Sequence, residues 1–241
     1  MRDLPRVATL VLPEFPITRA DVDGYAVLRL PEQVREVFED GANLVRVHSA
    51  ELAETIPNFG GKTTGEEYSL CFHQDHLNPH DDPRRYLMLT KHSGEARGSS
   101  TLAILQSAAQ DVLAIEERHF KDPALRAFMG HQRRYDTRFL ISEEEYDRCF
   151  DTENGYEETV AAYVARHRHP PDDLCVRLGI LGYLIRGSYA NQLVGETLEG
   201  IDGRFFAEEW MEAGMLIIDN PAVFHARLGG NQPPLQRNFC I

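Results

Sequence analysis

The first hundred residues alternate short apolar runs with polar or glycine-rich breaks, a pattern typical of strands joined by turns. Runs of this kind predict strands at residues 7–12, 24–30, 44–47, 68–73, 86–90 and 100–105. Between the second and third strands, Val34, Val37 and Phe38 recur at helical spacing and predict one short helix over residues 31–40. This part of the chain is therefore expected to be mainly β.

The middle of the chain changes to a helical period. Helices are predicted at residues 107–119 and 156–167, the second of them stopped by Pro170-Pro171. Asp122-Pro123 has the order of a helix cap followed by proline in the first turn, which predicts another helix start. Residues 134–141 alternate and indicate a strand or hairpin arm. The segment 175–185 is apolar without a clear period, so its pattern does not choose between strand and helix.

Strands return near the C-terminus at residues 214–219, 223–228 and 237–241, with a weaker candidate at Phe205-Phe206. A helical centre between β-rich flanks predicts an α+β protein with a double-stranded β-helix core, a jelly roll of the cupin-like kind. We expect one domain over residues 1–241. Its jelly-roll halves are expected at about 44–106 and 176–241, with a helical insertion at about 107–175.

Composition narrows the function classes. The 241 residues include 25 Lys and Arg against 38 Asp and Glu, a net charge of −13 that disfavours binding to nucleic acid or to anionic membranes. The four cysteines form no Cys-x-x-Cys pair, which indicates free thiols in a reducing compartment. Residues 1–5 lack the apolar core of a signal peptide, and no apolar run approaches a membrane span. We expect a cytoplasmic protein.

The strongest chemical signal is His73-Gln74-Asp75 together with a distant His225. Side chains alternate along a strand, so His73 and Asp75 are expected on one face. Two imidazoles and one carboxylate on one side of an octahedron are typical of non-haem Fe(II) sites, because three positions stay open. Two alternatives stand beside this interpretation. Asp75 could merely cap a turn, and His76 and His80 could make a three-histidine zinc site instead.

Arg237 stands in an otherwise apolar terminal strand. A charge placed among apolar residues needs a partner, and the planar guanidinium suits a carboxylate group of a ligand. The alternative partner is an Asp or Glu of the protein itself. The sequence therefore predicts either an anion-binding arginine or an internal salt bridge at this position.

These residues resemble the TauD/clavaminate-synthase-like group of Fe(II)/2-oxoglutarate-dependent oxygenases. The resemblance covers roughly residues 66–106 and 210–241, including Asp219-Asn220 ahead of a His-x-Arg sequence. The glycine pair that usually precedes the threonine strand of that group is Gly98-Ser99 here. The residues that match the group's motif are His73, Asp75, Thr101, His225, Arg227 and Arg237.

The resemblance implies a chemistry and a set of roles. His73, Asp75 and His225 would hold Fe(II), while Arg237 and Thr101 would bind the distal carboxylate of 2-oxoglutarate. That co-substrate and O2 would be consumed with release of succinate and CO2. The retained Asp75 favours hydroxylation, desaturation or cyclisation over halogenation, because related halogenases have a small residue there.

The substrate is expected to be a small molecule, by analogy an amino acid or a derivative, with contacts from Asn78, His80 and Arg186. The oligomeric state is left open, with a homodimer as one option. Three other functions compete with this one: a cupin-type metal enzyme that does not use 2-oxoglutarate, a non-catalytic jelly-roll binding protein, and an oxygenase acting on a macromolecule. The binding protein predicts that His73 and His225 lie far apart.

Overall fold

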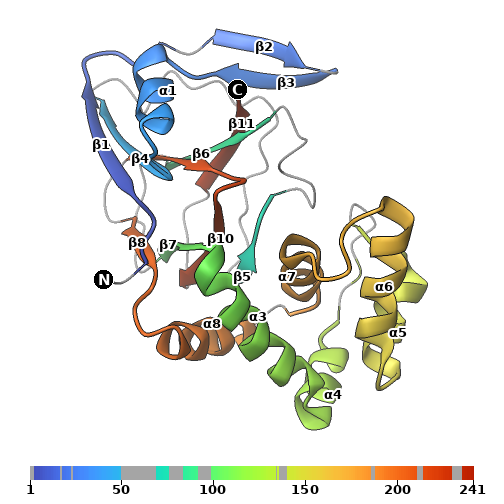
Figure 1. The fold of residues 1–241 in the computed structure, drawn as a ribbon. Coiled ribbons are helices and arrows are strands. Elements are labelled where there is room, and N and C mark those ends of the chain that lie inside the picture. The colour runs from blue at the N-terminus through green and yellow to red at the C-terminus, as the bar shows by residue number, and fades with distance from the viewer. Residues whose placement is uncertain are drawn as a thin grey trace.

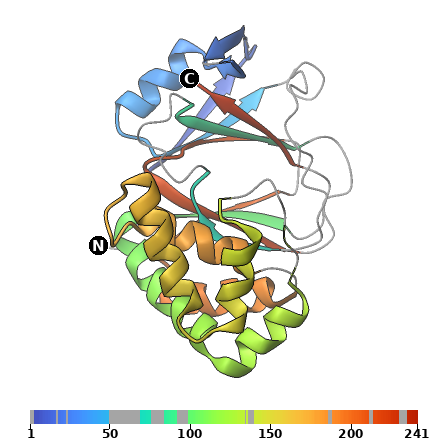
Figure 2. The same ribbon diagram turned by 90° about the vertical axis from the view of Figure 1, so that its right-hand side faces the viewer.

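Two stacked β-sheets and a layer of helices make up the protein (Figures 1 and 2). The computed structural model describes residues 3–16, 18–22, 24–49, 69–75, 84–91, 99–133, 135, 140–185, 188–210, 214–229 and 235–241. The larger sheet contains, in spatial order, β1 (Val7–Leu12), β4 (Leu44–Ser49), β9 (Met215–Asp219), β6 (Tyr86–Lys91), β11 (Leu235–Cys240), β3 (Tyr25–Arg29) and β2 (Thr18–Val22). The smaller sheet contains β5 (Leu70–His73), β10 (Val223–Gly229), β7 (Ser99–Leu105) and β8 (Phe206–Glu209).

The connectivity from β5 to β11 is that of a jelly roll. The chain passes from the smaller sheet (β5) to the larger (β6) and back to the smaller (β7), then continues through β8 on the smaller, β9 on the larger, β10 on the smaller and β11 on the larger. Helices are inserted between β7 and β8. The predicted α+β class with a jelly-roll core and a helical insertion is therefore confirmed.

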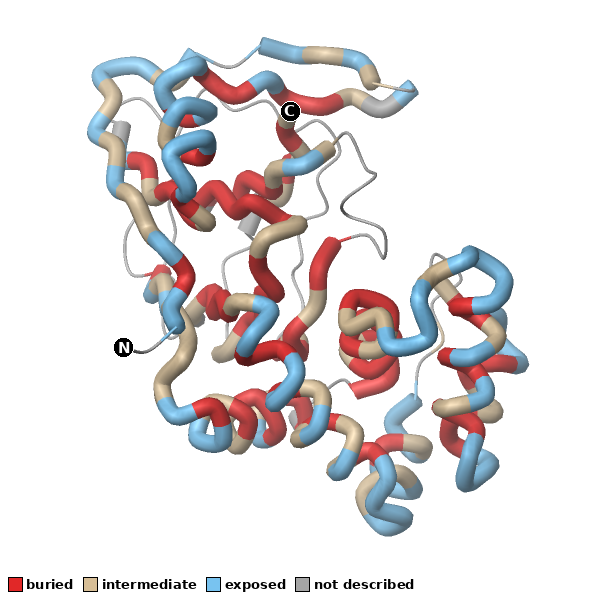
Figure 3. The backbone as a smooth tube through the Cα atoms, in the orientation of Figure 1, coloured by how far each residue is buried: buried red, intermediate tan, exposed pale blue. Residues whose placement is uncertain are grey.

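Three apolar layers hold the architecture together. Leu87 and Leu216 of the larger sheet meet Ala103 and Val223 of the smaller one in the space between the sheets. The outer face of the larger sheet packs on α1 (Glu32–Glu39), which contributes a buried Val34 and Phe38. The outer face of the smaller sheet packs on the helical layer. Figure 3 shows buried residues, in red, along the strands at the centre of the molecule and along α7. Each sheet is consequently covered on both faces over its centre, because its strands supply apolar residues to two layers.

The helical insertion extends further along the chain than the sequence predicted. Its members are α3 (Gln106–Lys121), α4 (Pro123–His131), α5 (Glu143–Asp151), α6 (Gly155–His167), α7 (Leu174–Leu184) and α8 (Ser188–Gly200). The expectation that the second jelly-roll half begins near 176 is wrong, because residues there form α7 and α8, and strands resume at β8. Nearly every residue of α7 is buried, so no polar stripe marks it as a helix in the sequence.

Side-chain caps mark the starts of α4 and α5. Asp122 accepts hydrogen bonds from the Ala124 and Leu125 N–H groups at the start of α4, as the Asp-Pro pair predicted. Ser142 and Glu145 form a reciprocal capping box at the start of α5, a helix that the sequence interpretation did not include. The strand expected at 134–141 falls largely outside the described residues. None of the described helices has the length and apolar character needed to cross a membrane.

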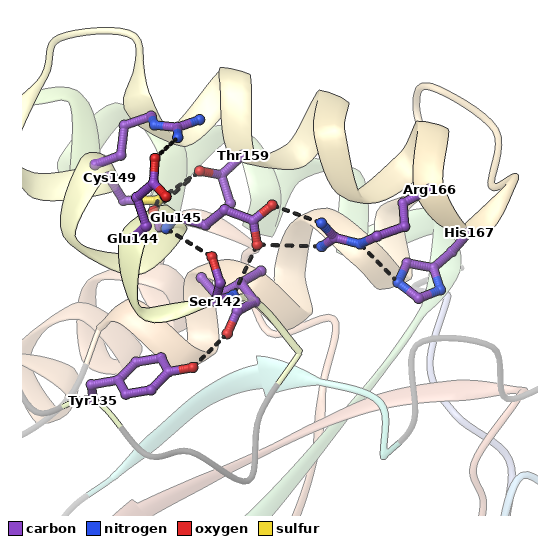
Figure 4. A network of polar contacts seen from close by, with 10 residues as sticks. Tyr135, Ser142, Glu144, Glu145, Cys149, Thr159, Arg166 and His167 are labelled. Carbon is purple, nitrogen blue, oxygen red and sulfur yellow. Dashed lines mark hydrogen bonds and ion pairs between the residues drawn. The ribbon is translucent and has the colours of Figure 1, made fainter.

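A polar network fastens α5 to α6 (Figure 4). Arg166 donates to both carboxylate oxygens of Glu145, at 2.9 and 3.3 Å. The fully buried Thr159 hydroxyl donates to the Glu145 backbone oxygen at 3.2 Å. These contacts lie within the helical layer, so they provide a reference region for substitutions that perturb the fold without touching the sheets.

Candidate metal centre

The two sequence-predicted histidines face each other across neighbouring strands. In the antiparallel pair of β5 and β10, His73 lies directly opposite His225, and their ring centroids are 4.5 Å apart. β10 is flanked on its other side by β7, where Ala103 is the partner of His225. Two positions more than 150 residues apart in the sequence are thus brought together by the β-ladder itself.

Asp75 completes a three-residue cluster just beyond the end of β5. One ligand atom from each of His73, Asp75 and His225 can be chosen so that all three lie within 4.8 Å of one another. The His225 Nε2 atom is 3.4 Å from Asp75 Oδ2. His225 and Asp75 are buried, whereas His73 is partly exposed. In the described part of the chain, this is the group whose side chains are arranged to hold a metal ion.

The donors have the protonation states that a metal requires. The His73 Nδ1 atom lies 2.8 Å from the Cys71 carbonyl oxygen, which can only accept, so Nδ1 carries the proton and Nε2 presents a lone pair. Removal from water, assisted by His225, lowers the pKa of His73 to about 4. Burial alone would raise the pKa of Asp75, but Arg237, His225 and His73 outweigh it and hold that pKa well below its usual range. At neutral pH the cluster therefore contains a neutral His73 and an ionised Asp75.

Two buried atoms of the cluster have no hydrogen-bond partner among the described residues. They are Asp75 Oδ2 and His225 Nδ1. Leaving a buried carboxylate oxygen without a partner is costly, and a cation between the three side chains would remove that cost. Two imidazoles with one carboxylate suit a non-haem ferrous ion. The residues present therefore fit the metal that the motif predicted.

Arg237 reaches the cluster from the opposite sheet. It projects from β11, and its Nη1 atom donates to Asp75 Oδ1 at 2.6 Å. About a third of the side chain is exposed (32%), and the guanidinium also lies over the Phe239 ring. The internal salt bridge considered as an alternative from the sequence is thus present. It also places a guanidinium in contact with the three-residue cluster.

Thr101 lies on the same face of the smaller sheet as the histidines. It is paired with Arg227, two positions along the ladder from the pair formed by Ala103 and His225. The Trp210 indole N–H donates to the Thr101 hydroxyl oxygen at 2.7 Å, and both side chains are buried. Because that oxygen accepts from Trp210, its own proton is available to another acceptor. Sequence reasoning missed Trp210, which has no motif around it.

The remaining sequence-predicted contacts cannot be placed. Asn78, His80 and Arg186 lie outside the described residues, as does the alternative ligand His76. The structure therefore brings together His73, Asp75, His225 and Arg237. It places Thr101 on the shared face.

Comparisons with known proteins show only distant likeness. No family model matches the chain, and no curated protein matches it. Among solved structures, PvcB, "an Fe, alpha-ketoglutarate dependent oxygenase from an isonitrile synthetic pathway", is 13% identical, with 98% of this chain and 86% of that chain covered and a TM-score of 0.39. AAD-2 in complex with Mn(II) and N-oxalylglycine is 13% identical, with coverage of 93% and 97% and a TM-score of 0.41.

The non-heme iron oxygenase OrfP is similarly distant. It is 12% identical, with 88% of this chain and 81% of that chain covered and a TM-score of 0.37. Likeness of this extent does not assign the chain to a family.

Proposed function

We propose that this protein is a non-haem Fe(II)/2-oxoglutarate-dependent dioxygenase that hydroxylates an aliphatic carbon of a small molecule. The observation that carries the proposal is the His73, Asp75 and His225 cluster with the Arg237 guanidinium in contact with one of its ligands. Two imidazoles and one carboxylate would hold an Fe(II) that acts on a 2-oxo acid. An arginine beside them offers a charged fork for the far carboxylate of that acid.

Each side chain has a defined task in this proposal. His73 would hold the metal through Nε2 and His225 through a ring nitrogen, and Asp75 would supply the anionic ligand. Fe(II) with 2-oxoglutarate and O2 supplies the oxidising power, consuming the 2-oxo acid to succinate and CO2. Arg237 orients the 2-oxo acid by its distal carboxylate. The Thr101 hydroxyl donates to the same group because its oxygen is already engaged by Trp210.

The metal cluster also separates the proposal from its competitors. A non-catalytic jelly-roll binding protein predicted that His73 and His225 lie far apart, which the 4.5 Å between their ring centroids contradicts. A cupin-type enzyme without 2-oxoglutarate remains the second candidate. It would make Arg237 dispensable for turnover and would use His76 or His80 as a metal ligand. The role of Arg237 is therefore the point at which these two functions differ.

The substrate class follows from analogy and charge. An amino acid or amino-acid derivative is the proposed substrate, with Asn78, His80 and Arg186 as proposed contacts. The net charge of −13 favours a small molecule over nucleic acid or an anionic membrane surface as the partner. A cytoplasmic location is part of the same proposal.

Replacing Arg237 by alanine is expected to weaken 2-oxoglutarate binding by about a hundredfold, because one partner of a hydrogen-bonded charge pair is lost. Trp210 is the only tryptophan in the chain and contacts Thr101, so its fluorescence can report the titration. The measurement uses Mn(II)-loaded protein without O2, in which no turnover occurs. Arg133→Ala, which removes an arginine that pairs with Asp147 and Asp151 in the helical layer, is the matched control.

A second titration separates this role from a purely internal one. If Arg237 serves only as the salt-bridge partner of Asp75, Arg237→Ala changes Mn(II) affinity in the absence of 2-oxoglutarate and leaves the affinity of the metal-loaded protein for the 2-oxo acid unchanged. That result would favour the cupin-type enzyme. A loss of 2-oxoglutarate affinity in the metal-loaded protein supports the dioxygenase, whether or not Mn(II) affinity also changes with the loss of the contact to Asp75.

A further inference from the structure

Asp75 is held differently from the two histidines. His73 and His225 are opposed residues in the ladder between β5 and β10, which fixes their backbones. β5 ends at His73, so Asp75 lies past the last ladder residue. A ligand in such a position needs other support, because both its backbone and its carboxylate must be fixed for a metal to be bound tightly.

The side chain of Asn220 supplies that support. Its Oδ1 accepts from the Asp75 N–H at 3.0 Å, and its Nδ2 donates to the Asp75 carbonyl oxygen at 2.5 Å. The side-chain amide of Asn220 thus pairs with both the backbone N–H and the backbone carbonyl of Asp75, as a neighbouring strand would do. Asn220 is 1% exposed, so these hydrogen bonds are not exchanged for bonds to water.

Gln74 makes the reciprocal connection. Its Nε2 lies within hydrogen-bonding distance of three backbone oxygens, those of Asn220 (2.8 Å), Pro221 (3.1 Å) and Val223 (3.3 Å). Val223 begins β10, the strand that carries His225. Gln74 therefore connects the segment that bears His73 and Asp75 to the start of the strand that bears the third ligand.

The turn at residues 219–222, here called the clasp turn, is itself anchored to the larger sheet. Arg85 donates to both carboxylate oxygens of Asp219, each at 2.8 Å. The Asn220 N–H donates to the Arg85 carbonyl oxygen at 3.2 Å, and the Asp219 N–H donates to the Asn43 carbonyl oxygen at 3.0 Å. A rigid frame thus extends from the larger sheet through the clasp turn to Asp75.

We propose that Asn220, supported by Gln74, is a positioning residue that fixes the metal ligand Asp75. The inference rests on the proposed metal site and assigns a role that the ligand motif does not contain. Without Asn220, the buried N–H and carbonyl groups of Asp75 lose their partners, and the contacts of its carboxylate with Arg237 and His225 no longer rest on a fixed backbone. The backbone of Asp75 then moves, and the third ligand no longer meets the metal in the geometry set by the ladder.

Metal affinity distinguishes positioning from simple stabilisation. The probe is Co(II), added to metal-free protein and followed by its visible absorption, which reports coordination geometry as well as affinity. Asn220→Ala removes both hydrogen bonds to Asp75. Asn220→Asp keeps the shape and the acceptor but replaces the donor by an oxygen facing the Asp75 carbonyl. In both variants we expect Co(II) affinity to fall tenfold to a hundredfold, roughly the effect of losing an outer-shell partner, with an altered visible spectrum.

A matched control shows what loss of stability alone does. Thr159→Val removes a buried hydrogen bond in the helical layer while keeping the side-chain shape. Figure 4 shows the position of Thr159. The substitution is expected to lower the thermal midpoint and to leave Co(II) affinity and spectrum unchanged. Gln74→Met, which loses the three contacts to the clasp turn, is expected to weaken Co(II) binding less than Asn220→Ala does.

The outcomes separate the two levels of the account. Wild-type protein that fails to bind Co(II) contradicts the proposed metal site. Wild-type binding with unchanged affinity and spectrum in folded Asn220→Ala and Asn220→Asp contradicts the positioning role alone. An equal loss of affinity in Thr159→Val also overturns it, because general destabilisation then accounts for the effect.

Discussion

Replacing His225 by alanine is expected to abolish metal-dependent activity and to weaken Fe(II) binding by well over a hundredfold. Loss of an outer-shell partner typically costs roughly 10–100-fold in metal affinity, and removal of a ligand costs more. His225 is 6% exposed and lies opposite His73, so the ladder holds its imidazole in place, and a water in the space left by alanine would be a weaker and less fixed ligand. Only two of the three proposed ligands, His73 and Asp75, would then remain. Two ligands hold a ferrous ion less tightly than three on one face of an octahedron.

The test is iron content after anaerobic equilibrium dialysis, with succinate release from 2-oxoglutarate as the activity readout. His48→Ala is the control, because His48 is an exposed histidine on β4 of the larger sheet. Wild-type iron content in a folded His225→Ala protein would show that the metal is held elsewhere. His76 and His80, the alternative ligands that the sequence suggested, would then be the next positions to replace.

The second large effect concerns stability and comes from Glu116 on α3. This side chain is fully buried, and neither carboxyl oxygen has a well-formed hydrogen bond to a described residue. Burial raises its pKa from 4.5 to about 8, although the backbone of Phe72 offsets part of the rise. A carboxylic acid inside the apolar layer behind β5 therefore stays protonated at neutral pH.

The sign of the pH dependence follows from this shift. The folded state keeps the Glu116 proton up to about pH 8, whereas the unfolded chain loses it above 4.5. The contribution of Glu116 is consequently complete below pH 4.5 and is lost as the pH rises through 8. At 1.36 kcal/mol per pKa unit, the free energy of unfolding falls by about 4 kcal/mol between pH 5 and pH 9 on account of this group. That is a large share of the roughly 5–15 kcal/mol typical of a folded protein.

Glu116→Gln removes the ionisation while nearly keeping the shape. We expect its free energy of unfolding to be close to that of the wild type at pH 5 and to exceed it by about 4 kcal/mol at pH 9. Urea unfolding of metal-free protein at pH 5, 7 and 9 measures the difference. Glu143→Gln, an exposed change at the start of α5, serves as the control. Parallel pH profiles for wild type and Glu116→Gln would show that the folded protein does not retain this proton.

The jelly-roll strands could be predicted because their signals are local. Short apolar runs such as 214–219 and 86–90 have the length and spacing of strands, and both were found where expected. Elements that lack a contrast between an apolar and a polar face were missed. β2 is an edge strand with mostly exposed side chains, and α7 is buried on nearly all sides, so neither shows contrast between two faces. The capping box of Ser142 and Glu145 was the available signal for α5.

The grouping of His73, Asp75 and His225 could be predicted because His-x-Asp on a strand with a distant His on another strand has a specific chemistry. The parts contributed by Asn220 and Trp210 could not, since they depend on hydrogen bonds between residues more than a hundred positions apart. The sequence left Arg237 with two partners to choose from. The structure shows the one inside the protein, Asp75.

The central claim is that the cluster binds Fe(II) together with 2-oxoglutarate, and it is tested most directly by anaerobic titration of the metal-free protein with both. A ferrous ion chelated by a 2-oxo acid has a weak metal-to-ligand charge-transfer band in the visible region. The account predicts that this band appears when 2-oxoglutarate is added to the Fe(II)-loaded protein, is absent in His225→Ala and is weakened in Arg237→Ala. Folded, iron-loaded wild-type protein that gives no band would contradict the dioxygenase and favour a cupin-type metal enzyme.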